Sequence, residues 1–164
     1  MDIFEYAMKM EQDGKAFYEE QATKTELAEL KNILLELAAD EQKHYNIFKA
    51  MKEGKKTEYE EGKKTKIVTS VKNVFEDLKS RNQDFAFPGD IVAAWEEARE
   101  IEKKSEDFYR EKAGEVGAQE QKHILNRIAD EEHKHWQTIE NVIQFLNRPQ
   151  SWLEDAEWNH MEDY

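Results

Sequence analysis

Apolar residues recur every three or four positions along most of this chain, the spacing that places them on one face of an α-helix. The pattern runs through four long stretches, residues 2–23, 26–53, 90–113 and 118–147, and through a shorter one at 66–82. The tail, residues 148–164, carries Trp152 and Trp158. We expect it to form a short helix that packs on the rest of the chain or on a second subunit. The chain is therefore predicted to be all-α.

Residues that begin or end helices bound these stretches. Asp2 is predicted to cap the first helix, with Glu5 completing a capping box. The other predicted caps are Thr25 and Asp90, and the predicted helix-ending turns contain Gly54, Pro88-Gly89, Gly114 and Gly117. Tight turns make each pair of long helices an antiparallel hairpin.

Two helical hairpins, residues 2–53 and 90–147, are joined by a connection over residues 54–89. A connection of this length can cross the length of a bundle, which predicts one crossover rather than a simple up-and-down order. We expect a single domain over residues 1–164. Its fold would be a four-helix bundle with a short helix in the crossover and a short C-terminal helix or tail.

The two hairpins repeat one another at a fixed offset of 91 residues. In the first helix of each hairpin, Glu11 aligns with Glu102, and Phe17-Tyr18 aligns with Phe108-Tyr109. In the second helix, Glu41-Gln-Lys-His44 aligns with Glu132-His-Lys-His135. One offset serves both helices without a gap, which indicates an internal duplication.

In each long helix a glutamate occupies a position that the spacing reserves for an apolar residue: Glu11, Glu41, Glu102 and Glu132. A histidine follows one turn later on the same face of the second and fourth long helices, at His44 and His135. The neighbouring core positions on the other two helices are small, which leaves room for a cluster: Ala7, Gly14, Ala98 and Ser105. Two Glu-x-x-His pairs with two further glutamates form the ligand set of a dinuclear metal site in a bundle.

The charges of this set support the same interpretation. Four carboxylates in one buried layer would repel one another and would be costly to ionise. Two divalent cations cancel four negative charges, and neutral imidazoles add none. The mixture of oxygen and nitrogen ligands suits iron or manganese. A single Glu-x-x-His pair is more often a solvated pair on a charged helix, but two copies in matching phase, each with an upstream glutamate, favour a metal site.

Further residues are expected beside this site. Tyr18 and Tyr109 lie one turn beyond the small residues, either as core tyrosines with hydrogen-bonded hydroxyls or as groups that support the ligands or relay radicals. Asp40 and Glu131 directly precede two of the glutamates. Each either hydrogen-bonds the far nitrogen of a histidine from the opposite half or faces solvent. His133 is expected to face solvent.

Composition narrows the classes of function. The chain has no cysteine among its 164 residues, which excludes disulfides, thiolate metal sites and cysteine nucleophiles. A net charge of −13 argues against nucleic acid, whose phosphates require Lys and Arg. No apolar run approaches the roughly 20 residues of a membrane span, and the N-terminus lacks the features of a signal peptide. We therefore expect a cytoplasmic protein without a nucleic-acid or membrane partner.

These motifs resemble the rubrerythrin branch of the ferritin-like superfamily over nearly the whole chain, to about residue 147. The matching segments are Glu11-Gln-Asp-Gly-Lys-Ala-Phe-Tyr18, Asp40-Glu41-Gln-Lys-His44, Glu102 with Phe108-Tyr109, and Glu131-Glu132-His-Lys-His135. The resemblance implies that Glu41 and Glu132 bridge two iron ions at the catalytic centre. It also implies terminal carboxylates, Glu11 and Glu102, and one histidine for each metal, His44 and His135.

Two features depart from the classical members of that branch. Those proteins carry a rubredoxin-like iron domain with four cysteines, whereas this chain has no cysteine. They also carry an extra glutamate three residues before the position of Glu102, where this chain has Arg99. The ligand set is therefore more similar to the symmetric bacterioferritin type.

Three functions remain open at this point. The first is an oxidoreductase of the peroxidase or ferroxidase type, with two iron (or manganese) ions, which reacts with O₂ or hydrogen peroxide and takes electrons from a separate donor protein. The second is an iron or manganese binding, storage or delivery protein without sustained catalysis. The third is a structural bundle stabilised by its metals. A homodimer or higher homo-oligomer is expected, because the clustered aromatic residues of the tail favour an interface.

Overall fold

The computed structural model describes residues 2–55 and 64–163, and all the regular structure within those ranges is helical. The long helices are α1 (Ile3–Lys24), α2 (Ala28–Lys52), α4 (Gly89–Glu115) and α5 (Gln119–Asn147). The shorter ones are α3 (Ile67–Ser80), α6 (Pro149–Glu154) and the 3₁₀ helix η2 (Glu157–Asp163). The all-α prediction is confirmed, whereas residues 56–63 of the predicted crossover lie outside the described residues.

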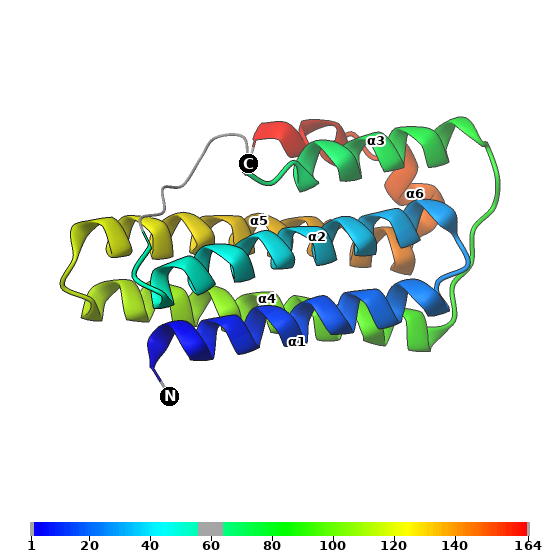
Figure 1. Ribbon diagram of the computed structural model, residues 1–164. Helices are drawn as coiled ribbons and strands as arrows, with labels where there is room; N and C mark the ends of the chain where they lie inside the picture. Colours follow the sequence, from blue (N-terminus) through cyan, green and yellow to red (C-terminus); the bar gives the residue numbers. More distant parts are fainter. Residues whose placement is uncertain (1, 56–63, 164) are drawn as a thin grey trace.

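The four long helices form a bundle of two antiparallel hairpins, α1 with α2 and α4 with α5 (Figure 1). The crossover returns along the bundle through α3 and enters α4 at the end where α2 begins, so α2 and α4 run in the same direction. Helix α3 packs on the outer side of α2 and α5. This is the predicted ferritin-like bundle with one crossover.

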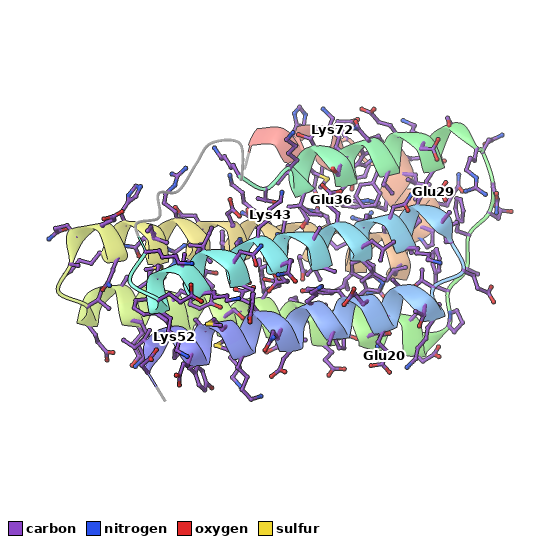
Figure 2. The ribbon with its side chains drawn as sticks, viewed as in Figure 1. Glu20, Glu29, Glu36, Lys43, Lys52 and Lys72 are labelled. Atoms are coloured by element: carbon purple, nitrogen blue, oxygen red, sulfur yellow. The ribbon has the colours of Figure 1, made fainter. Side chains whose placement is uncertain are left out.

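Polar and apolar residues separate between the faces of these helices, as their spacing predicts. Charged side chains such as Glu20 and Lys52 lie on the outer faces of the bundle (Figure 2). The apolar positions turn inward and supply the core. None of the helices in the described ranges combines the length and the apolar character needed to cross a bilayer.

The ends of the first hairpin agree with the sequence in part. Asp2 caps α1 and accepts a hydrogen bond of 2.9 Å from the backbone N–H of Glu5, as predicted. The prediction that Thr25 caps α2 is wrong. Its hydroxyl donates to the carbonyl of Gln21 at 2.7 Å, which closes the last turn of α1, and Leu27 is the residue that precedes α2.

The ends of α4 also differ from the prediction. Pro88, with its extended backbone, is the residue that precedes the helix, so Asp90 lies inside the first turn rather than capping it. A carboxylate there is favourable because it faces the positive end of the helix dipole. The helix continues through Gly114 to Glu115. Gly54, by contrast, adopts a left-handed φ of 73° and ends α2 as predicted.

The core consists of two apolar clusters with a polar layer between them. The larger cluster lies where α3, α6 and η2 cover the bundle, and it includes Leu37 and Phe75. The smaller cluster is built from the four long helices and includes Phe48 and Leu125. The polar layer interrupts the core at the level where the sequence predicts a metal site.

The tail packs on its own chain. Trp152 and Trp158 are buried, and their rings lie 5.7 and 6.1 Å from the ring of Phe75 on α3, measured between centroids. These aromatic residues therefore complete the larger apolar cluster. The homo-oligomer stays a prediction. The aromatic residues of the tail no longer support it, because they are buried within their own chain.

Candidate metal centre

The six candidate ligands from the sequence meet in the polar layer between the two apolar clusters. Their side chains come from all four long helices: Glu11 from α1, Glu41 and His44 from α2, Glu102 from α4, and Glu132 and His135 from α5. Each of them is at most 2% exposed. They turn inward because each occupies a core position in the three-or-four spacing of its helix.

Their ligand atoms form two overlapping groups. The first group is Glu11, Glu41, His44 and Glu132, and the second is Glu41, Glu102, Glu132 and His135. Within each group, one oxygen or nitrogen atom per residue lies within 4.8 Å of the others. Glu41 and Glu132 belong to both groups, which is the position of a carboxylate shared between two ions.

Several buried atoms of this layer have no hydrogen-bond partner. They are Oε2 of Glu11, Oε1 of Glu41, Nδ1 of His44, Oε2 of Glu102, and both carboxylate oxygens of Glu132. Each unpartnered buried polar atom costs about 1–3 kcal/mol, and more when it is charged. Such atoms gathered at one point are unfavourable for the protein alone but are available as ligands. Four carboxylates and two imidazoles fit a pair of divalent ions such as iron or manganese.

Without cations, this layer retains protons. Burial, followed by repulsion between neighbouring carboxylates, raises the pKa of both Glu41 and Glu132 well above 4.5. Burial acts to lower the pKa of His44 and His135, but the surrounding carboxylates outweigh it and raise both values well above 6.5. Cations that bind here therefore displace protons from the same atoms.

A buried carboxylate from the opposite hairpin holds the far nitrogen of each histidine. Nε2 of His44 lies 2.8 Å from Oε1 of Glu131, and Nε2 of His135 lies 2.8 Å from Oδ2 of Asp40. Both carboxylates are buried rather than solvent-facing, which decides between the two alternatives left open by the sequence. Nδ1 of each ring is left facing the glutamates. Nδ1 of His44 lies 2.8 Å from Oε1 of Glu132, but the two atoms do not meet in hydrogen-bonding geometry. Such carboxylate–histidine contacts fix the orientation of the ring at metal sites.

The charge of Asp40 follows from its partners. Burial acts to raise the pKa of this carboxyl group, but its hydrogen bond to His135 and the charge of that ring lower the pKa to about 2. Asp40 is therefore ionised at neutral pH, which suits a group that accepts the N–H of an imidazole.

The two tyrosine hydroxyls also cross between the hairpins. Tyr18 donates a hydrogen bond to Oε1 of Glu102, and Tyr109 donates one of 2.6 Å to Oε1 of Glu11. Burial and then the adjacent carboxylates raise the pKa of both phenols well above 10, so each remains a proton donor. Because one oxygen of each glutamate is held in this way, the other oxygen, Oε2, is the one free to bind a cation.

Two residues near the site, Thr65 and Glu106, were not singled out by the sequence. Thr65, just before α3, contacts both Asp40 and Glu131. Thr65 lies outside every periodic stretch. The only sequence feature that could have pointed to it is that it is a hydroxyl residue shortly before an apolar run. Glu106 of α4 lies 3.0 Å from Nδ1 of His133, which is therefore half-exposed rather than fully in solvent.

The position of the extra rubrerythrin glutamate supplies no further ligand. The guanidinium of Arg99 lies 2.5 Å from a carboxylate oxygen of Glu140 on α5. On α1, a Cβ added to Gly14 would lie 3.2 Å from Oε2 of Glu41. The small residue at Gly14 therefore provides the space in which one of the shared carboxylates sits.

Comparison with known proteins matches this chain to a family. A family model described as rubrerythrin matches residues 2–143, a range that includes both hairpins' candidate ligands and the crossover between them. Comparisons with curated proteins and with solved structures gave no match.

Proposed function

Because this chain belongs to the rubrerythrin family, we propose that it is a di-iron carboxylate oxidoreductase that reacts with O₂ or hydrogen peroxide. The buried cluster of glutamates and histidines fits the metal site that this function needs. Manganese is the alternative metal, since it accepts the same oxygen and nitrogen ligands.

One observation carries this proposal: unpartnered oxygen and nitrogen atoms converge in a buried layer. A purely structural core would not gather several such atoms at one point, because buried polar groups are almost always hydrogen-bonded. Here, the atoms left without partners come from five of the six candidate ligands, and all six side chains are buried. Two cations would satisfy them and would cancel the charge of four carboxylates.

The residues divide between the two proposed ion positions. Glu41 and Glu132 would hold both ions, since both belong to each group of ligand atoms. We define position 1 by Glu11 and His44, and position 2 by Glu102 and His135. The near-symmetric arrangement gives each position one unshared carboxylate and one imidazole.

Two bound iron ions would supply one electron each to a small oxidant such as O₂ or hydrogen peroxide. The chain's own residues prepare the site for that chemistry. The apolar clusters on both sides of the layer keep bulk water out. The hydroxyls of Tyr18 and Tyr109 hold one oxygen of each unshared carboxylate. Electrons for further turnovers would come from a separate donor protein, since these 164 residues contain no cysteine that could hold a second iron centre.

Metal analysis of protein purified without added metal tests the first part of the proposal. Two bound ions per chain are expected, and iron is the expected metal. A protein that takes up no iron or manganese, even when either is supplied anaerobically, would contradict the proposed function.

Rapid mixing of the Fe(II)-loaded protein with O₂, and separately with hydrogen peroxide, tests the second part. An oxidoreductase should oxidise its iron quickly and should turn over many times with peroxide when a reductant is present. Oxidation or uptake of iron without sustained turnover would favour iron handling instead. Glu41→Gln provides the matched control, because it removes a shared ligand while keeping nearly the same shape.

A further inference from the structure

Thr65 lies outside both hairpins and contacts the site from the crossover. It lies two residues before the start of α3 and is nearly buried, with 9% of its surface exposed. Figure 1 shows the start of α3 lying over the middle of the bundle, beside α2 and α5. From this place, Thr65 reaches one carboxylate on each of those two helices.

The two contacts use different atoms of Thr65. Its backbone N–H donates a hydrogen bond of 3.0 Å to Oε2 of Glu131. Its hydroxyl donates to Oδ2 of Asp40, and the same hydroxyl oxygen accepts a hydrogen bond of 3.2 Å from the backbone N–H of Ile67. A side-chain substitution therefore removes the contact to Asp40 but leaves the contact to Glu131.

Each of these carboxylates contacts one of the two histidines. Asp40 holds Nε2 of His135, and Glu131 holds Nε2 of His44. Thr65 is thus linked through a single carboxylate to each of the two proposed ion positions. The duplication gives it no equivalent, since the residue 91 positions later is Ala156, in the tail between α6 and η2. At Thr65 the symmetry between the two halves is broken.

We propose that Thr65 is a positioning residue whose hydroxyl, through Asp40, sets the orientation of His135 and so tunes position 2 without affecting position 1. The inference rests on the proposed function, because it requires ions at both positions. Partners that orient a metal-binding histidine typically change metal affinity by about 10–100-fold when removed. An effect of that size is expected at position 2 alone.

The test is an anaerobic titration with Co(II). Binding is measured by calorimetry and by the visible absorption of the bound ion. Two backgrounds separate the positions: Glu102→Gln weakens position 2, and Glu11→Gln weakens position 1. Adding Thr65→Val should lower the affinity of the remaining strong site about 10–100-fold in the Glu11→Gln protein. The same substitution should leave the Glu102→Gln protein unchanged, as in a double-mutant cycle.

Two further variants distinguish positioning from a general loss of structure. Thr65→Ser keeps the hydroxyl and should restore wild-type Co(II) affinity and absorption. Ser70→Ala removes another hydroxyl, on α3 and away from the site, which donates a hydrogen bond of 2.8 Å to Glu36 of α2. This variant should leave Co(II) binding unchanged. If Thr65→Val fails to fold, as judged by circular dichroism, Thr65→Ala removes the same hydroxyl with a smaller side chain and must give the same selective loss.

Failure of the inference is distinct from failure of the proposed function. If the wild-type chain binds two ions but Thr65→Val weakens both positions equally or neither, only the role of Thr65 is overturned. A Thr65→Ser protein that behaves like Thr65→Val would overturn it as well. If the wild-type chain binds no ions under any of these conditions, both proposals are overturned.

Discussion

Gly14→Ala should have opposite effects on the metal-free and metal-bound protein. Gly14 lies in the interior of α1, where alanine stabilises a helix by about 0.5–1 kcal/mol relative to glycine. The added Cβ would lie 3.2 Å from Oε2 of Glu41, so that carboxylate must move by a few tenths of an ångström. Without metal the movement costs little, because Oε1 of Glu41 has no hydrogen bond to lose when the carboxylate shifts. The metal-free variant should melt about 1–4 °C above the wild type.

With metal the same movement is unfavourable. Glu41 belongs to both groups of ligand atoms, so a shift away from Gly14 disturbs both positions at once. Productive ligand geometry tolerates displacements of about 0.5 Å or less. A tenfold loss at each position, about 1.4 kcal/mol per ion, would exceed the gain in helix stability. In excess metal, the variant should therefore melt below the wild type.

Thermal unfolding with a chelator and with excess Fe(II) under anaerobic conditions measures both effects. Gly114→Ala is the matched control, because it adds a methyl group to a helical glycine with no atom within 4 Å of the new Cβ. It should raise the melting temperature without changing metal affinity. The reasoning is refuted if Gly14→Ala melts below the wild type in chelator, or if it binds metal as tightly as the wild type does.

Three more predictions follow from the same layer. Replacing both Glu41 and Glu132 by Gln should abolish loading at both positions in metal analysis, and retention of two ions would show that the ligand assignment is wrong. Tyr109→Phe leaves Oε1 of Glu11 without its donor, so calorimetry should show about tenfold weaker binding at position 1 only; equal weakening at both positions would contradict this role. The raised pKa values of Glu41 and Glu132 mean that these groups stabilise the metal-free fold when protonated, and that this contribution is lost as pH rises above 4.5 through the raised values. Urea unfolding in chelator should therefore show stability falling as pH rises above 4.5, and the extra stability given by metal should grow in the same direction. A metal-free protein that gains stability as pH rises above 4.5 would oppose the assignment.

The sequence predicts the inward face of each helix well, because that face depends on spacing alone. Glu41 and His44 lie three residues apart between apolar positions, so any packing of that apolar face buries them together. The offset of 91 residues then places the second pair at the same level of the bundle. The structure brings all six residues of the set into one layer for these reasons.

Other features of the site depend on how segments cross in space, which no local pattern records. The tyrosines were expected near the metals. That Tyr18 donates to a glutamate of the opposite hairpin, Glu102, follows from how the hairpins pack. Thr65 contacts the site only because the crossover returns over α2 and α5. The helix starts predicted at Thr25 and Asp90 were each two residues away from the observed ones, because the Thr25 hydroxyl bonds back to the carbonyl of Gln21 and α4 begins directly after Pro88.

The division of the core into two apolar clusters makes the two ends of the bundle unequal. At one end, α3 and the tail add a further layer of buried rings, including Phe75 and Trp152. At the other end, among the residues that the structure describes, the smaller cluster around Phe48 and Leu125 lacks that covering. Local opening should therefore begin at the thinner end, where amide hydrogens would exchange fastest. An ion could then enter or leave through transient separation of four helix ends, while the covered end keeps the chain folded.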